Sequence, residues 1–241
     1  MLGLPDGIRA CLFDLDGVLT QTAKVHARAW KQTFDQLLAR RGQPEFDIVA
    51  DYDEYVDGKP RYDGVRSFLR SRGIDIPEGH PDDPPDADTI RGVGNRKNEL
   101  VLKLIDRDGV EAYDGSVRYL HAVRDAGLPR AVVSSSANCR AVLRAAGIES
   151  LFDARIDGVV AGRQHLKGKP APDTFLAGAR ALGVAPAHAV VFEDALAGVQ
   201  AGRDGGFGFV VGVDRVGQAD ALRDHGATVV VRDLSELLPG A

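Results

Sequence analysis

Cysteine is scarce in this sequence and long apolar runs are missing, and each shortage excludes a class of protein. The 241 residues contain two cysteines, Cys11 and Cys139, in unrelated settings, so neither a disulfide framework nor a zinc site is expected. No window reaches the ~18 apolar residues of a membrane span, and the first residues lack the pattern of a signal peptide. We therefore expect a cytoplasmic protein with no membrane partner.

Positive charge is not in excess either. The chain has 30 Lys and Arg residues against 35 Asp and Glu residues, which gives a formal net charge of −5. Affinity for nucleic acid comes largely from basic side chains that neutralise phosphates, so no nucleic-acid partner is expected. Hydrophobic residues make up 44% of the chain, enough for a stable core. A small molecule is left as the expected partner, and a monomer is the expected state.

From about residue 110 onward, short apolar runs alternate with helical stretches rich in Ala, Leu and Arg. An opening run and four later ones stand at residues 8–15, 129–134, 188–194, 207–213 and 227–231. Apolar runs without polar alternation are typical of parallel strands buried on both faces and joined by helices. The pattern predicts a doubly wound, mainly parallel α/β sheet of Rossmann-like type, formed by residues 1–20 and 109–241.

Residues 21–108 interrupt this alternation. Three helical patterns, at 23–40, 64–72 and 90–106, follow each other without a convincing strand between them. A helical block placed between the first strand and the rest of a sheet is best explained as an inserted domain. We therefore expect residues 21–108 to form a helical cap domain.

Polar residues of distinct types follow three of the predicted strands. The first strand ends in Asp14-Leu15-Asp16-Gly17, the second in Ser134-Ser135-Ser136 and the third in Glu193-Asp194, while Lys169 precedes a later helix. In open α/β sheets, ligands bind beyond the carboxyl ends of the strands. The sequence therefore predicts an active site built from these residues.

A pair of carboxylates at this spacing suits phosphoryl transfer. Asp14 and Asp16 are two apart, so both side chains can face one pocket, and Gly17 lets the backbone turn away. A carboxylate attacks phosphorus directly, so Asp14 is predicted to be the nucleophile that forms an aspartyl-phosphate. Asp16 is predicted to be the general acid and base that moves the proton of the alcohol that leaves or attacks.

Charge decides what else this site needs. Several carboxylates would face a dianionic phosphate, and each repulsion at ~4 Å is worth roughly 4 kcal/mol at an effective dielectric near 20. Cations must compensate, and magnesium suits hard oxygen ligands. We expect Mg²⁺ as the cofactor, Lys169 as a further positive charge and Ser134 as a ligand of the phosphoryl oxygens. The candidate metal ligands are Asp14, Asp16, Glu193 and Asp194.

Together these residues resemble the haloacid dehalogenase-like phosphotransferases. The stretch FDLDGVLT at residues 13–20 looks like their first motif, Ser134 their second, Lys169 with its following proline their third, and Glu193-Asp194 their acidic fourth. All four motifs occur in the order of the family and span nearly the whole chain. The resemblance implies the same fold, the same aspartyl-phosphate chemistry and the same dependence on magnesium.

Further likeness lies in the stretches Gly58-Lys59-Pro60-Arg61 and Arg96-Lys97-Asn98 and in the serine run 134–138. These resemble the β-phosphoglucomutases, to which the chain is most similar within that superfamily. This resemblance implies a phosphomutase that interconverts β-glucose 1-phosphate and glucose 6-phosphate through a sugar bisphosphate. It also implies that Arg61 grips the phosphate that is not reacting, and that the 134–138 run contributes to both phosphate sites. The remaining residues assigned on this basis are Thr22, His26, Gly58 and Lys97 around the substrate, and Ser135, Ser136 and Asn138 at the phosphates.

Other interpretations of the same residues stay open. The runner-up function is a magnesium-dependent sugar-phosphate phosphatase, in which water accepts the phosphoryl group, and a non-catalytic sugar-phosphate binding protein is a third. Asp194 could be the N-cap of a helix that begins near Ala195, and Ser136 and Asn138 could cap another helix. Glu193 could be a ligand, a group behind the ligands or an acid at the rim. His26, four residues before Trp30, could simply pack inside the cap.

Overall fold

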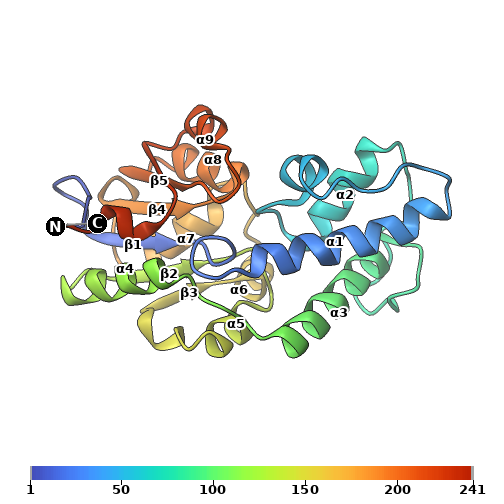
Figure 1. Ribbon diagram of the computed structural model, residues 1–241, viewed down its shortest axis with the longest axis horizontal. Helices are drawn as coiled ribbons and strands as arrows, with labels where there is room; N and C mark the ends of the chain where they lie inside the picture. The colour runs from blue at the N-terminus through green and yellow to red at the C-terminus, as the bar shows by residue number, and fades with distance from the viewer. Residues whose placement is uncertain (1, 240–241) are drawn as a thin grey trace. The chain divides into compact units, whose positions relative to one another are not determined.

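The protein forms two compact units in a computed structural model that describes residues 2–239 (Figure 1). One unit contains the chain up to Gln21 and from Val110 onward, and the other contains Thr22–Gly109. We call them the core unit and the inserted unit. That the inserted unit acts as a cap domain stays a prediction. None of the described helices is both long and apolar enough to cross a membrane.

A six-stranded sheet with the strand order β3-β2-β1-β4-β5-β6 forms the middle of the core unit. Every neighbouring pair of strands is parallel. The predicted fold class, a doubly wound α/β sheet, is confirmed. The strands are β1 (Ala10–Phe13), β2 (Arg130–Val133), β3 (Ala154–Ile156), β4 (Ala189–Glu193), β5 (Phe209–Val213) and β6 (Val229–Val231).

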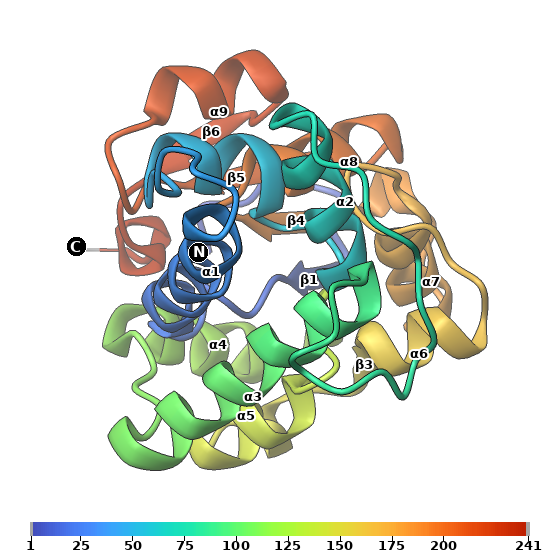
Figure 2. The same ribbon diagram turned by 90° about the vertical axis from the view of Figure 1, so that its right-hand side faces the viewer.

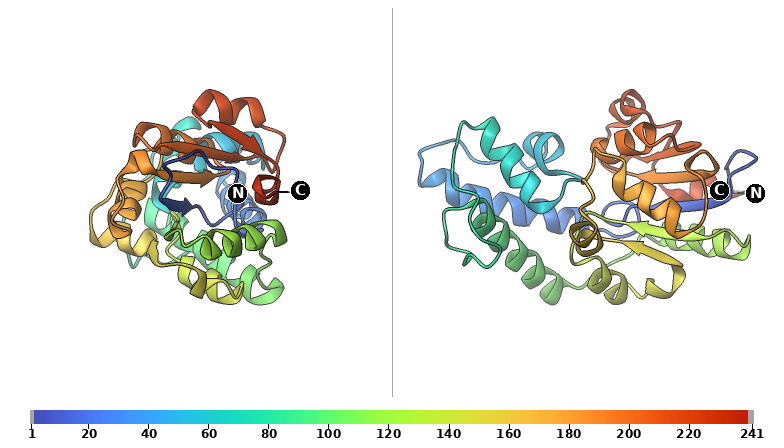
Figure 3. Two further views of the ribbon diagram at one scale, coloured as in Figure 1. Left: turned by 90° about the vertical axis from the view of Figure 1, so that its left-hand side faces the viewer. Right: turned by 180° about the vertical axis from the view of Figure 1, so that it is seen from behind.

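Helices cover both faces of this sheet (Figure 3). Successive strand residues point to opposite faces, so Leu12 packs in one cluster with Phe175 of α7. Phe13 lies on the other face, stacked on Phe192 with ring centroids 4.4 Å apart and met edge-on by Tyr119 of α4. The helices are α4 (Asp114–Asp125), α5 (Cys139–Ala145), α6 (Gly158–Arg163), α7 (Asp173–Ala181), α8 (Leu196–Asp204) and α9 (Ala219–His225), with short 3₁₀ turns η2 (Glu149–Leu151), η3 (Pro186–His188) and η4 (Leu234–Leu237).

The inserted unit is helical, with α1 (Thr22–Ala39), the π-helical turn η1 (Tyr52–Val56), α2 (Arg61–Ser71) and α3 (Ile90–Asp108). Helix α3 packs against both α1 and α2 (Figure 2). Their apolar faces enclose an aromatic core in which Phe34 and Phe68 lie with ring centroids 4.2 Å apart. This core belongs to residues 22–109 alone, so the unit has the packing of a domain.

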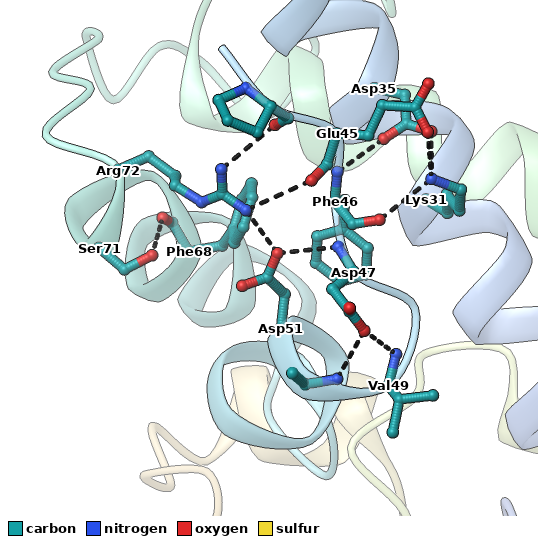
Figure 4. A network of polar contacts seen from close by, with 12 residues as sticks. Lys31, Asp35, Glu45, Phe46, Asp47, Val49, Asp51, Phe68, Ser71 and Arg72 are labelled. Atoms are coloured by element: carbon teal, nitrogen blue, oxygen red, sulfur yellow. Dashed lines mark hydrogen bonds and ion pairs between the residues drawn. The ribbon is translucent and has the colours of Figure 1, made fainter.

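A network of polar contacts orders the long connection between α1 and α2 (Figure 4). The Asp51 carboxylate accepts hydrogen bonds from the Arg72 guanidinium at 2.5 Å and from the backbone N–H of Asp47 at 2.9 Å. Asp47 in turn accepts the N–H groups of Val49 and Ala50. Side chains thus replace the missing regular structure and hold the backbone that leads to Gly58 and Arg61.

The chain leaves and re-enters the core unit at one point. The backbone N–H of Gln21 donates to the carbonyl of Glu111 at 2.9 Å, and Thr20 forms an antiparallel bridge with Ala112. Thr22, the first residue of the insertion, therefore directly follows Gln21, and Gly109, its last residue, stands two residues before Glu111.

Candidate active site

Three neighbouring strands deliver the predicted catalytic residues to one edge of the sheet. Strand β1 lies between β2 and β4, so Asp14, Ser134 and Glu193 stand side by side at the carboxyl ends of adjacent parallel strands. The backbone N–H of Asp14 donates to the carbonyl of Phe192 at 2.9 Å, which continues the sheet up to the predicted nucleophile. The three residues are at most 7% exposed.

Lys169 connects these strand ends. Its Nζ donates to Oδ1 of Asp14 and to Oε1 of Glu193, both at 2.5 Å, and to the carbonyl oxygen of Val133 at 3.2 Å. The ammonium also lies 4.9 Å from the ring centroid of Phe175. A single buried cation therefore joins β1, β2 and β4, and two carboxylates compensate its charge.

Burial and the nearby opposite charges shift the pKa values of this cluster in opposite directions. Burial raises the pKa of the Asp14 carboxyl well above its usual value, although the Lys169 ammonium pulls the pKa down. Burial lowers the pKa of Lys169, but Asp14 and Glu193 together raise it above its ordinary value. Lys169 thus stays charged, which a site for anionic phosphate requires.

Three carboxylates of the core unit lie close enough to hold one cation. Asp14, Glu193 and Asp194 each offer an oxygen, and these oxygens lie within 4.8 Å of one another. Both oxygens of Glu193 already accept hydrogen bonds, one from Lys169 and one from the backbone N–H of Ala195. Glu193 is fully buried, so its interpretation as an acid at the rim is wrong. The set leaves Asp14 and Asp194 as the carboxylates best suited to a metal.

The start of helix α8 tests whether Asp194 is the N-cap of that helix. The helix begins at Leu196, and its N-cap is Ala195 rather than Asp194. The backbone carbonyl of Asp194 accepts a hydrogen bond from Gln218 at 3.1 Å, which ties the residue to the loop after β5. The interpretation of Asp194 as the N-cap is therefore wrong.

The turn after β1 presents Asp16. Gly17 has φ of +88°, a backbone conformation that favours glycine. The N–H of Gly17 donates to the carbonyl of Thr20 at 2.8 Å, and the Thr20 hydroxyl donates to the carbonyl of Leu15 at 3.2 Å. Asp16 is half-buried in this turn and is not one of the three clustered carboxylates.

The serine run after β2 forms a succession of side-chain turns. The Ser134 hydroxyl accepts from the N–H of Ser136, and the Ser136 hydroxyl accepts from the N–H of Asn138, both at 3.1 Å. Asn138 stands at the N-cap of α5, but its side chain makes no capping hydrogen bond to that helix. Ser134 is buried beside the catalytic strand end, whereas Ser135, Ser136 and Asn138 are less buried.

Two predicted residues of the inserted unit meet each other. Nζ of Lys97 lies 2.9 Å from Nδ1 of His26 and 4.7 Å from the ring centroid of Trp30. Lys97 is 5% exposed, so it is a buried cation and not an ordinary surface lysine. Thr22 begins α1 and is buried, and Gly58 has φ of +68° in the turn before α2.

Arg61, the first residue of α2, is held by an aromatic neighbour that the sequence analysis did not single out. Its guanidinium donates to the Tyr62 hydroxyl at 3.1 Å and lies 4.8 Å from the centroid of that ring. The Tyr62 hydroxyl donates to Asn95 of α3 at 2.8 Å. Arg215 was also missed, and the signal available was its place just after β5, at the same sheet edge as Asp14.

Comparison with known proteins agrees with this geometry. A family model described as haloacid dehalogenase-like hydrolase matches residues 8–206. The chain belongs to the haloacid dehalogenase-like hydrolase family. Membership of this family confirms the resemblance that the four motifs indicated.

Relatives within the family include mutases and a phosphatase. A β-phosphoglucomutase of Mycobacterium tuberculosis is 58% identical over 99% of this chain and 94% of its own length. A validoxylamine A 7′-phosphate phosphatase of Streptomyces hygroscopicus subsp. limoneus is 30% identical, with 95% of each chain covered. The crystal structure of β-phosphoglucomutase from Clostridium difficile superposes with a TM-score of 0.75 at 29% identity, over 95% of this chain and 93% of that one.

Proposed function

We propose that this enzyme is a phosphomutase that interconverts β-glucose 1-phosphate and glucose 6-phosphate. The observation that carries the proposal is the buried contact of Lys169 with Asp14 and Glu193 where three strands end. The identity of 58% with a β-phosphoglucomutase over almost its full length supports this substrate. The sequence predicted the same reaction from its motifs. The predicted monomeric state and cytoplasmic location are kept as part of the proposal.

Asp14 is the proposed carrier of the phosphoryl group. In one half-reaction, the sugar 6-hydroxyl attacks the phosphorus of phospho-Asp14, the bond from phosphorus to Asp14 breaks, and Asp16 takes the hydroxyl proton. The resulting bisphosphate turns round. Asp14 then attacks the 1-phosphoryl group, the bond to the anomeric oxygen breaks, and Asp16 returns the proton to that oxygen. The products are glucose 6-phosphate and phospho-Asp14.

Lys169 and Ser134 are the proposed stabilisers of the transferring group. Lys169 already holds Asp14 at its Oδ1, which leaves the other carboxylate oxygen for the attack on phosphorus. Its ammonium opposes the charge that accumulates on the phosphoryl oxygens, and burial strengthens this interaction because the local dielectric is low. The Ser134 hydroxyl and the neighbouring backbone N–H groups are the proposed donors to the remaining oxygens, with Ser135, Ser136 and Asn138 behind them.

Magnesium fits the donor set of this site, which consists of hard carboxylate oxygens. Asp14 and Asp194 are the proposed ligands, with a backbone oxygen near Asp16, while Glu193 holds Lys169. When bound, the ion would neutralise negative charge between the carboxylates and the phosphate.

Residues of the inserted unit are proposed to select the substrate. Arg61 would grip the phosphate that is not reacting, and Thr22, His26, Gly58 and Lys97 would line the substrate. A second candidate, phosphatase activity, is favoured by the similarity to the validoxylamine A 7′-phosphate phosphatase at 30% identity.

A mutase must keep water from phospho-Asp14, because water competes at ~55 M with one sugar hydroxyl.

A product assay separates the two candidates. The enzyme is incubated with β-glucose 1-phosphate, magnesium and a trace of glucose 1,6-bisphosphate, and the products are identified. The proposal expects glucose 6-phosphate as the main product, and Asp14→Asn serves as the inactive control. Free glucose and inorganic phosphate as the main products would establish the phosphatase instead.

A further inference from the structure

Arg215 reaches the turn that carries Asp16 from the loop after β5. The residue follows β5, and its side chain is 15% exposed. Its Nε donates to the carbonyl of Gly17 at 2.9 Å, and a second guanidinium nitrogen lies 3.3 Å from the carbonyl oxygen of Val18. Gly17 is the residue directly after Asp16, so the guanidinium holds the backbone at the predicted general acid.

The same guanidinium is itself fixed from two other directions. A third nitrogen donates to the carbonyl of Arg232 at 2.7 Å and lies 3.4 Å from a carboxylate oxygen of Asp233. Its Cζ atom lies 3.6 Å from the ring centroid of Tyr113, whose own backbone N–H donates to the carbonyl of Leu19 at 2.9 Å. A planar group with several fixed donors is preorganised, so little freedom is lost when it holds the turn.

The turn needs such an external support. The hydrogen bonds within the turn run from Gly17 to the carbonyl of Thr20 and from Leu19 and Thr20 to the carbonyl of Leu15, and these bonds use neither the Gly17 carbonyl nor the Val18 carbonyl. Ser116 of α4 donates to the Val18 carbonyl at 2.7 Å, which leaves the Gly17 carbonyl to Arg215. Without Arg215, the Gly17–Val18 peptide, the second one after Asp16, would lose the hydrogen bond that fixes its carbonyl.

We propose that Arg215 is a positioning residue for Asp16 in the phosphoryl-transfer reaction. This inference rests on the proposed role of Asp16 as general acid. A general acid acts when it lies within hydrogen-bond reach of the leaving oxygen, and a displacement of ~1 Å can cost up to about 10²-fold in rate. By fixing the Gly17 carbonyl, Arg215 fixes the backbone from which the Asp16 side chain projects.

The test uses leaving groups that differ in their need for a proton. Phenyl phosphate has a basic leaving oxygen that needs an acid, whereas 2,4-dinitrophenyl phosphate departs as a stable anion. We would measure kcat/KM for both esters, because this ratio reports phosphoryl transfer to Asp14. Arg215→Met should lose about tenfold or more with phenyl phosphate and less than about threefold with the dinitrophenyl ester.

Matched variants separate positioning from folding. Arg223→Met removes an exposed arginine of α9 and should leave both ratios unchanged. Arg215→Lys keeps the charge but not the planar fork, so it should show a smaller preference of the same sign, and it replaces Arg215→Met if that variant does not fold. Equal losses of Arg215→Met on both esters, or no loss on either, would overturn the proposal.

The variant Asp16→Asn separates a failure of the Arg215 proposal from a failure of the proposed role of Asp16. It should show the same dependence on the leaving group, and more strongly. If Asp16→Asn shows the dependence and the Arg215 variants do not, only the role of Arg215 is wrong. If Asp16→Asn loses equally with both esters, the assignment of Asp16 as the acid is wrong, and the Arg215 proposal is overturned with it.

Discussion

Gly17 and Asp194 approach so closely that no side chain fits between them. A Cβ atom at Gly17 would lie 1.8 Å from Oδ2 of Asp194, and the φ of Gly17 is +88°. The turn after β1 thus touches a predicted metal ligand at the end of β4. Two requirements, one of space and one of backbone conformation, fall on the same residue.

Gly17→Ala should therefore damage activity far beyond its effect on folding. The strained φ alone costs of the order of 1–3 kcal/mol, and the added methyl group also displaces Asp194. Gly127→Ala is the matched control, because Gly127 has φ of +72° and a Cβ atom there would meet nothing within 4 Å. We expect similar losses of thermal stability but loss of turnover in Gly17→Ala alone. Equal turnover in both variants would contradict this expectation.

Asp14→Asn should lower turnover by several orders of magnitude, because the variant keeps the shape of the side chain and loses the attacking oxygen. The measurements are steady-state turnover and trapping of the phosphoenzyme. An aspartyl-phosphate is labile at high pH, so the phosphoryl group trapped on the wild-type enzyme should be released in base. Retention of a tenth of wild-type turnover would rule out this nucleophile.

Chelation should abolish activity, and added magnesium should restore it. Asp194→Asn removes one proposed ligand charge, so it should raise the magnesium concentration needed for half-maximal activity by about tenfold or more. Asp220→Asn, at a carboxylate that is 98% exposed, is the control and should leave the requirement unchanged. The readout is magnesium binding by calorimetry as well as turnover. Unchanged binding in Asp194→Asn would refute the ligand assignment.

Arg61→Ala should damage mutase turnover much more than hydrolysis of a small aryl phosphate, which has no second phosphate to grip. Tyr62→Phe removes the hydroxyl that joins Arg61 to Asn95, so it should show the same preference with a smaller loss. Lys97→Ala should follow the pattern more weakly. Both reactions would be measured for each variant at saturating magnesium. Parallel losses for Arg61→Ala would favour the phosphatase.

Both cysteines should resist labelling in the folded enzyme. Burial raises the pKa of Cys11 to about 12, although Arg130 opposes this, and burial also raises the pKa of Cys139. At pH 8 only ~10⁻⁴ of the Cys11 thiol is then ionised, and the thiolate is the reactive form. A thiol reagent should react fully in denaturant and only slowly without it. Rapid labelling of the native enzyme would contradict the described burial.

The sequence predicted those strands whose residues form an apolar run. Strands β1, β2, β4, β5 and β6 are apolar over most of their length and were expected within a few residues. Strand β3 was missed because it has only three residues and the charged Arg155 is the middle one. Helix α9 was missed because its seven residues are largely polar and show only one buried position, Leu222.

The part of the candidate site that lies at the ends of strands could be predicted from the sequence. Asp14, Ser134 and Glu193 follow apolar runs, so the rule for α/β sheets places them together. The Lys169 ammonium binds both Asp14 and Glu193. This contact depends on the conformation of a loop, which the periodicity of the sequence does not encode. Arg215 was missed because the available signal, its place just after β5, is weak, and an arginine in a polar loop is ordinarily a surface residue.

The hydrogen bond between Gln21 and Glu111 has a consequence for how such enzymes diversify. The two core residues that flank the insertion are hydrogen-bonded to each other. Residues 22–109 therefore form one closed loop between two fixed points of the core unit. The entropy of closing a loop grows only logarithmically, by about 0.6 kcal/mol for each doubling of length. Segments of the insertion can therefore lengthen or be exchanged at little cost to the sheet. Substrate range can change in this way while Asp14, Lys169 and Glu193 keep their geometry.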